Sequence, residues 1–257
     1  MPVTVITGSA SGIGAAIRTA LTAAGYTIIG IDRHDADIVA DLSHPAGRKA
    51  AVDAALAACG GSLDGLVCSA GLGPHCQSDD IVAVNYFGAT ALLDGLFPAL
   101  QRGTQPAAVA IASVASVQMD FDGHPLRAAF LDGNEDEAKR LCRAAGDQAA
   151  AGLAYAASKH ALVCDVRRRT YSWGGAGVRI NAVAPGPIET PLLRDTCEDP
   201  RYHATIRDFV PPIGRVGRAD EVAALTQFLL SPAAGFIHAS VFFIDGGIGA
   251  LMHPTRF

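Results

Sequence analysis

The chain has 257 residues, of which 50% are hydrophobic and 18% charged, enough for one large domain or two small ones with a sizeable core. The formal net charge is −5 and the basic residues are scattered, which argues against nucleic acid or an anionic membrane as a partner. We find no secretory signal and no apolar run long enough to span a bilayer. The six cysteines lack metal-binding spacing, so we expect reduced thiols, a cytoplasmic location and no metal site.

Seven short apolar runs predict strands, at residues 3–7, 27–31, 38–40, 63–69, 107–112, 178–184 and 241–244. Helical patterns lie between them, at residues 13–24, 45–58, 81–100 and 220–230, and in a stretch that carries Tyr155 and runs to about residue 173. Strands that are apolar on both faces and alternate with helices predict a parallel sheet covered on both sides. No break in composition divides the chain. We therefore expect an α/β fold, with residues 1–257 forming a single Rossmann-type, doubly wound domain.

Two segments depart from simple alternation of strands and helices. Residues 118–151 are too many for a structureless loop in a compact domain, so we expect a helical insertion there. Residues 191–215 contain three prolines after Pro191 and are expected to form a substrate lid over the carboxyl edge of the sheet.

Three glycines, Gly8, Gly12 and Gly14, lie between the first strand and the first helix. Glycines at this place allow a tight turn and let backbone N–H groups approach a pyrophosphate at the positive end of the helix. The spacing GxxxGxG differs from the GxGxxG of many dinucleotide-binding folds. A glycine-rich turn without a ligand therefore remains the alternative.

Asp32 ends the second strand, where a carboxylate can accept hydrogen bonds from the ribose of adenosine. Its negative charge would repel a 2′-phosphate, which favours NAD over NADP. Arg33 follows directly and could turn toward such a phosphate, which weakens the preference for NAD. The alternative for Asp32 is a turn or helix-cap carboxylate.

Tyr155 and Lys159 are four residues apart on a predicted helix, so their side chains point the same way. A neighbouring cation lowers the pKa of a phenol from its usual ~10 and would make Tyr155 a proton-transfer group. The alternative is an ordinary, partly exposed helix face. Among nearby serines, Ser113 directly follows the fifth strand, where ligands gather, whereas Ser116 and Ser158 do not.

Several motifs in the same order resemble the short-chain dehydrogenase/reductase family: Thr7-Gly8-xxx-Gly12-Ile13-Gly14, Asn85, Ser113, Tyr155-xxx-Lys159 and Pro185-Gly186. The resemblance runs from Val3 to about Gly247. Within the family, further stretches resemble bacterial enzymes that oxidise 3α-hydroxysteroids and reduce carbonyl compounds; among them are Ala70-Gly71-Leu72-Gly73-Pro74, Val84 to Thr90 and the tail Pro254-Thr255-Arg256-Phe257.

The resemblance implies a role for each matching residue. Tyr155 would be the general acid/base, Ser113 would polarise the substrate carbonyl, and these two would bind the substrate. Lys159 would bind the nicotinamide ribose and lower the pKa of Tyr155, and Asn85 would support a proton-relay water. The cofactor would be lined by Gly8, Ser9, Ala10, Ser11, Gly12, Ile13, Asp32, Asp41, Leu42, Ala70, Gly71, Tyr155, Lys159, Ile188 and Thr190. Many relatives have Asn-Asn-Ala-Gly where this chain has Cys68-Ser69-Ala70-Gly71, which we interpret as altered local packing.

The predicted function is an NAD(H)-dependent oxidoreductase that interconverts a secondary alcohol and a ketone, with a 3α-hydroxysteroid as the expected substrate. The predicted apolar lid, from Leu192, Leu193, Ile206, Phe209 and Val210, favours a hydrophobic ligand. The alternatives are another hydrophobic alcohol or ketone, a sugar, polyol or acyl thioester, and an NAD(H)-binding sensor without turnover. We expect a homodimer, because the insertion would cover the helices that often pair subunits in this family.

Overall fold

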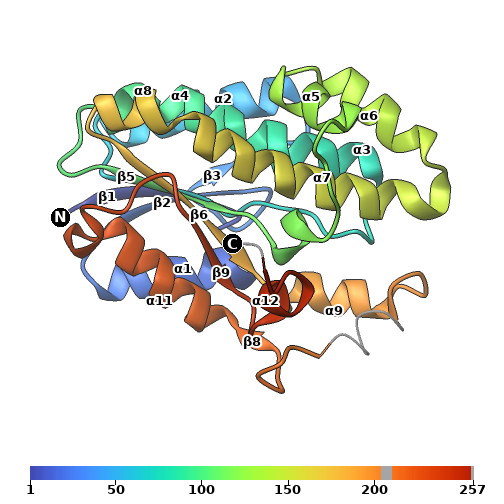
Figure 1. Ribbon diagram of the computed structural model, residues 1–257. Coiled ribbons are helices and arrows are strands. Elements are labelled where there is room, and N and C mark those ends of the chain that lie inside the picture. The colour runs from blue at the N-terminus through green and yellow to red at the C-terminus, as the bar shows by residue number, and fades with distance from the viewer. Residues whose placement is uncertain (204–209, 256–257) are drawn as a thin grey trace.

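A computed structural model of the chain describes residues 1–203 and 210–255; the predicted lid residues Ile206 and Phe209 and the tail residues Arg256 and Phe257 lie outside this part. Its centre is a seven-stranded sheet in the order β3-β2-β1-β4-β5-β6-β9, with every neighbouring pair parallel. Helices α2, α4, α7 and α8 cover one face and α1 and α11 the other (Figure 1). The predicted doubly wound Rossmann-type sheet is confirmed.

The strands follow the expected apolar runs closely. They are β1 (Val3–Thr7), β2 (Thr27–Asp32), β3 (Ile38–Val39), β4 (Gly65–Cys68), β5 (Ala107–Ile111), β6 (Arg179–Pro185) and β9 (Val241–Ile244). Successive residues of the central strands enter opposite halves of the core: Leu66 packs in the cluster on one face and Val67 in the cluster on the other. Because both faces are buried, the strands are mainly apolar, and polar residues within them such as Thr4 and Asn181 are buried as well.

Two further strands had no sequence signal. β7 (Ile188–Glu189) and β8 (Gly217–Arg218) form a separate parallel pair of two residues each. Two residues are too few to show a periodic pattern. The pair forms because two loops meet at the carboxyl side of the sheet.

The larger helices are α1 (Gly12–Ala23), α2 (Pro45–Ala58), α4 (Ala89–Leu100), α7 (Asp147–Arg168) and α11 (Ala219–Leu230). Shorter helices are α3 (Ser78–Val82), α8 (Thr170–Gly175), α9 (Pro191–Glu198) and α12 (Ile248–Met252), and the 3₁₀ turns are η2 (Val114–Val117) and η3 (Pro232–Ala234). Within residues 118–151 lie α5 (Pro125–Leu131), α6 (Glu135–Ala144) and the first turn of α7. In Figure 1, α5 and α6 pack beside α3 and α7 on one face of the sheet.

The helix expected at residues 81–100 begins earlier and is interrupted by a π-helical turn, η1 (Ala83–Gly88), between α3 and α4. By length and composition alone, the stretch Ser78–Leu100 could cross a membrane, with a mean hydropathy of 1.3 over its most apolar window. The expectation that no such run exists is therefore wrong. Here 61% of that window is buried inside the protein, and Leu92, Leu93 and Leu96 are wholly buried, so its apolar side chains form the core.

Candidate active site

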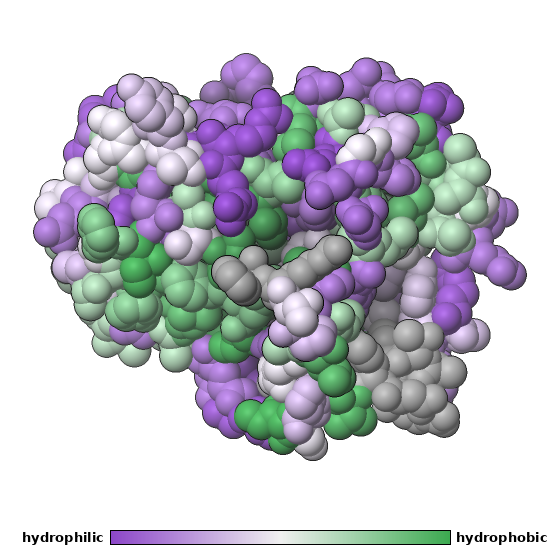
Figure 2. Space-filling view, viewed as in Figure 1, coloured by the Kyte–Doolittle hydropathy of each residue, from purple (hydrophilic) through white to green (hydrophobic). Residues whose placement is uncertain are grey.

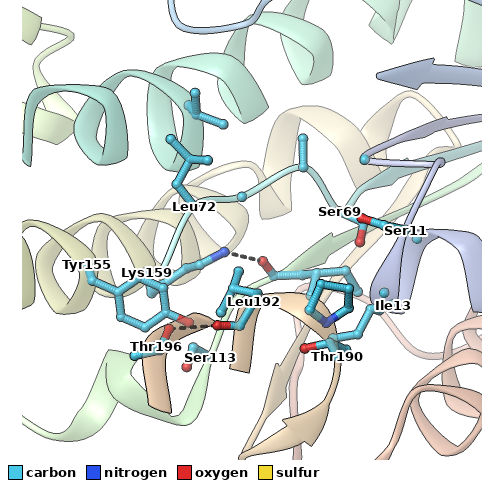
Figure 3. A pocket seen from close by; sticks show the side chains of 18 of the residues that line it. Ser11, Ile13, Ser69, Leu72, Ser113, Tyr155, Lys159, Thr190, Leu192 and Thr196 are labelled. Carbon is cyan, nitrogen blue, oxygen red and sulfur yellow. Dashed lines mark hydrogen bonds between the residues drawn. The ribbon is translucent and has the colours of Figure 1, made fainter. Parts of the chain in front are cut away.

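A cavity of about 870 Å³ opens at the carboxyl ends of the strands. The order of the strands reverses between β1 and β4, and parallel α/β sheets bind ligands in the crevice at such a point. Figure 3 shows Tyr155, Lys159 and Ser113 at one end of this cavity and Ser11, Ile13 and Thr190 at the other. The sheet therefore brings both predicted groups of residues into a single space.

Ser113 and Tyr155 meet at the first of these ends. Ser113 follows β5 and begins η2, where its Oγ accepts a hydrogen bond from Ala115 N at 3.2 Å and is thereby oriented. Tyr155 projects from the middle of α7. Burial raises the pKa of Tyr155, and a hydrogen bond with Ser113 acts in the opposite direction without cancelling it. The phenol and the hydroxyl are thus close enough to act on one substrate oxygen.

Lys159 lies one helical turn after Tyr155 and is 5% exposed. Its Nζ donates a hydrogen bond to the carbonyl oxygen of Ile111 at 2.8 Å, and burial lowers its pKa to about 8. The expected lowering of the Tyr155 pKa by Lys159 is not observed in this structure, where the pKa of Tyr155 is raised. The reason is that desolvation of the phenol outweighs the favourable interactions.

Asn85 lies in η1, and π-helical turns of this kind are frequent at functional sites. Its Oδ1 accepts from Leu72 N at 2.7 Å and its Nδ2 donates to Leu72 O at 3.0 Å, so the amide holds the loop after β4. A Cβ added to Gly71 in that loop would stand 3.4 Å from Asn85 Oδ1 and 3.5 Å from Lys159 Nζ. Asn85 and Lys159 are therefore neighbours across Gly71.

The glycine-rich turn brings β1 and the start of α1 into close contact. A Cβ on Gly14 would lie 2.0 Å from the carbonyl oxygen of Gly8, so only glycine fits there. Ser11 precedes the helix, and its own side chain makes no capping hydrogen bond to the first N–H groups. Uncapped N–H groups at a helix N-terminus suit an anion such as a pyrophosphate, so this turn fits a dinucleotide.

Two carboxylates mark the opposite end of the cavity. Asp32 accepts hydrogen bonds from Ala10 N at 3.0 Å and Arg33 N at 2.7 Å, which fix its orientation. Asp41 accepts from Ser43 N at 2.9 Å, and this hydrogen bond is the main reason that its pKa is lowered. Because Asp32 and Asp41 both line the cavity, an adenosine could lie between them.

The loop that begins at Cys68-Ser69, where the chain departs from many relatives, is held by the neighbouring strand. The hydroxyl of Thr7, at the end of β1, accepts hydrogen bonds from Ser69 N at 3.1 Å and Ala70 N at 3.0 Å. A threonine on the neighbouring strand thus holds the loop that carries Ala70 and Gly71.

Most of the predicted site residues line the cavity: Gly8, Ser11, Gly12, Ile13, Asp32, Asp41, Leu42, Ala70, Gly71, Ser113, Tyr155, Lys159, Ile188 and Thr190. Ser9, Ala10 and Asn85 are not among the lining residues, and Ser9 and Asn85 are buried. Of the predicted lid, Leu192 and Leu193 line the cavity, whereas Val210 does not and is 59% exposed.

Sequence reasoning missed Thr196 and Tyr202, which line the cavity from the segment after Thr190. Thr196 lies one helical turn after Leu192 and donates a hydrogen bond to its carbonyl oxygen at 2.7 Å. Its i, i+4 spacing from Leu192, a predicted lid residue, was the sequence pattern that could have indicated that it lines the cavity. Its Oγ1 also lies 2.9 Å from His75 Nδ1, which joins α9 to the loop after β4. Tyr202 follows α9 and had no periodic signal.

Comparisons with known proteins agree with this geometry. Residues 2–126 match the family model for short chain dehydrogenases, and residues 140–249 match that for enoyl-(acyl carrier protein) reductase. The chain is 51% identical to 3-alpha-hydroxysteroid dehydrogenase/carbonyl reductase of Comamonas testosteroni over 100% of both proteins. It is 31% identical to galactitol 2-dehydrogenase (L-tagatose-forming) of Cereibacter sphaeroides, over 94% of this chain and 92% of that protein.

The crystal structure of 3-alpha-hydroxysteroid dehydrogenase from Pseudomonas sp. B-0831 complexed with NADH superposes with a TM-score of 0.96 and 54% identity, covering 99% of this chain and 100% of that one. Levodione reductase superposes with a TM-score of 0.73 and 28% identity, covering 97% and 98%. The resemblance predicted from the motifs is therefore confirmed, and the chain belongs to the short-chain dehydrogenase/reductase family.

Proposed function

We propose that this protein is an NAD(H)-dependent oxidoreductase that interconverts a secondary alcohol and its ketone, with a 3α-hydroxysteroid as substrate. The observation that carries the reaction is the meeting of Tyr155, Ser113 and Lys159 at one end of the cavity. When bound, the cofactor supplies or accepts the hydride at the carbinol carbon. The chain itself must then bind the substrate, orient it and move one proton.

Tyr155 moves that proton in this proposal. In the free protein, burial raises the pKa of Tyr155, so the phenol is protonated and ready to donate to a ketone oxygen. Ser113 donates a second hydrogen bond to the same oxygen and favours the charge that develops on it during reduction. In the oxidation direction, Tyr155 must lose its proton, and a cation nearby favours the phenolate.

Lys159 lies one helical turn after Tyr155, but the pKa of Tyr155 stays raised in the free protein, so the role proposed for Lys159 is to hold the ribose next to the nicotinamide. Its fixed contact with Ile111 O leaves further ammonium hydrogens for the ribose hydroxyls. Asn85 binds the backbone of Leu72 and is a neighbour of Lys159 across Gly71, which supports the proposal that a relay water binds beside these two side chains.

Cofactor selection rests on Asp32 at the adenosine end. Its carboxylate, oriented by Ala10 N and Arg33 N, would accept hydrogen bonds from the ribose hydroxyls and repel a 2′-phosphate. Arg33 also lines the cavity, so kinetic measurements must decide how strongly NAD is preferred over NADP.

The steroid substrate is supported by similarity and by the apolar wall of the cavity. A relative with 51% identity over its whole length is named for 3α-hydroxysteroid dehydrogenase and carbonyl reductase activities. Leu192, Leu193 and Leu72 line this chain's cavity, and burying a hydrocarbon ring system contributes about 25 cal/mol per Å². The same wall would accept unrelated hydrophobic ketones, so carbonyl reduction is proposed as a second activity.

The experiment is an NAD-reduction assay with androsterone, its 3β epimer and simple sugars. We expect turnover of androsterone and little with the epimer or the sugars. Equal rates on both epimers, or activity on sugars alone, would refute the proposed steroid substrate but not the proposed oxidoreductase activity. NADH binding without turnover of any alcohol would favour the sensor.

We also propose a homodimer in the cytoplasm. Helices α5 and α6 lie against α7 and α3, so the surface of α7 that could pair with a second subunit is partly covered. Figure 2 shows hydrophobic residues gathered around the edge strand β9 and its neighbours, where Phe228, Phe243 and Leu251 are between 41% and 66% exposed. This edge is our choice for the dimer contact, and light scattering showing a tetramer would contradict it. The six free cysteines fit a reducing compartment.

A further inference from the structure

Arg48 is a charged side chain buried in α2, only 7% exposed, and no catalytic step above uses it. Its Nε donates to Leu42 O at 2.7 Å and its Nη2 donates to Ser43 O at 3.2 Å. Leu42 and Ser43 both line the adenosine end of the cavity. Arg48 therefore holds the turn that follows β3 by two of its backbone carbonyls.

The same guanidinium also reaches the helix that carries Asn85. Its Nη2 lies 3.1 Å from the carbonyl oxygen of Ala83, the first residue of η1. Leu42 touches this helix as well, since a Cβ on Gly88 would lie 3.2 Å from Leu42 Cβ.

The counter-charge comes from the 118–151 segment, 87 residues away in the sequence. Glu135, the first residue of α6, accepts from Arg48 Nη1 at 2.6 Å and from Nη2 at 3.0 Å, a two-bond geometry that fixes the guanidinium in place. Lys139 Nζ lies 2.8 Å from the same carboxylate. Burial opposes ionisation of Glu135, but its hydrogen bonds to Arg48 and Lys139 hold its pKa below the usual value.

Helix α2 packs tightly against the turn formed by residues 41–43. A Cβ on Gly47 would stand 1.9 Å from the carbonyl oxygen of Asp41, so the helix backbone lies directly against the turn. A shift of Arg48 would therefore move Asp41 and Leu42, which line the cavity.

We propose that Glu135 and Arg48 are positioning residues for the cofactor: the helical insertion holds the turn 41–43 in the shape that receives adenosine. The insertion thereby sets cofactor affinity from outside the cavity. This inference rests on the proposed binding of NAD(H) and assigns to the insertion a part in that binding.

The test compares Glu135→Gln with Glu137→Gln. Glu137 lies on the same helix two residues later but pairs with Arg140 at the surface, so its variant controls for a lost charge on α6. Binding of ADP-ribose and NADH is measured by calorimetry well below the melting temperature, alongside kcat at saturating NADH. ADP-ribose keeps the adenosine, pyrophosphate and second ribose but lacks the nicotinamide, so its affinity does not depend on contacts of the nicotinamide ring.

We expect Glu135→Gln to weaken ADP-ribose and NADH binding by a similar factor, roughly five- to tenfold, with kcat nearly unchanged and Glu137→Gln like wild type. Unchanged ADP-ribose affinity in Glu135→Gln, or a loss in kcat alone, would overturn the inference. If Glu135→Gln does not fold, Glu135→Asp keeps the charge but is too short for both bonds, and the same readouts apply. Failure of the wild type to bind NADH would instead refute the proposed function.

Discussion

The ammonium of Lys159 lies 2.8 Å from the carbonyl oxygen of Ile111, the last residue of β5. Helix α7 and strand β5 are thereby joined beside the position where Ser113 leaves the strand. The contact fixes Lys159 in a buried place where its charge is costly, which lowers its pKa to about 8.

A first prediction follows from the sign of that shift. Between pH 8 and the unfolded value of 10.5, the unfolded chain binds a proton at Lys159 that the folded chain has lost. The stability cost of the buried charge is therefore full below about pH 8 and is relieved as the pH rises. The stability of wild type relative to Lys159→Met should increase by about 3 kcal/mol between pH 7 and 10.5. Urea unfolding of both proteins across this range measures it, and a constant difference would contradict a depressed pKa.

A second prediction concerns proton transfer by Tyr155. Tyr155→Phe removes the phenolic hydroxyl while keeping the ring, so kcat should fall roughly 10²- to 10⁴-fold and NADH should bind with nearly unchanged affinity. Tyr171→Phe, at a tyrosine that is 93% exposed on α8, is the control and should have wild-type kinetics. Stopped-flow rates and NADH titrations of both variants check this, and near-normal turnover in Tyr155→Phe would refute the assignment.

A third prediction concerns the glycine-rich turn. Gly14→Ala would place a methyl group 2.0 Å from Gly8 O, and neither backbone can retreat without opening the turn. We expect at least tenfold weaker NADH binding and a loss of roughly 1–3 kcal/mol in unfolding free energy. Gly175→Ala is the matched control, because an added Cβ there meets no atom within 4 Å. Similar effects in the two variants would show that the turn tolerates a side chain.

A fourth prediction concerns cofactor choice at Asp32. Wild type should have a clearly higher kcat/KM with NAD than with NADP, and Asp32→Ser should narrow the ratio by removing like-charge repulsion. Steady-state kinetics with both cofactors measure the ratio. A wild type that prefers NADP would mean that the Arg33 side chain governs selection at this end of the cavity.

The sequence alone predicted the elements that depend on local periodicity. The spacing of Tyr155 and Lys159 puts both side chains on one helix face wherever the helix lies, and α2 and β9 have their expected bounds. The glycines at positions 8, 12 and 14 predicted a tight strand–helix turn, because the backbone segments that come into close contact there are near one another in the sequence. Motif resemblance added the order of these pieces and so the fold and the family.

The tertiary structure decided what depends on distant residues. Ile111 lies 48 positions from the lysine that it binds, and Arg48 lies 87 positions from Glu135, so no pattern in the sequence links either pair. The pKa of Tyr155 follows from how much the surrounding core desolvates the phenol, which helix spacing does not reveal. The π-helical turn at Asn85 and the placement of Thr196 against His75 likewise exist only once separate elements have packed together. Local backbone conformation depends on neighbouring residues in the sequence, whereas burial and long-range hydrogen bonds depend on how the elements pack in the folded protein.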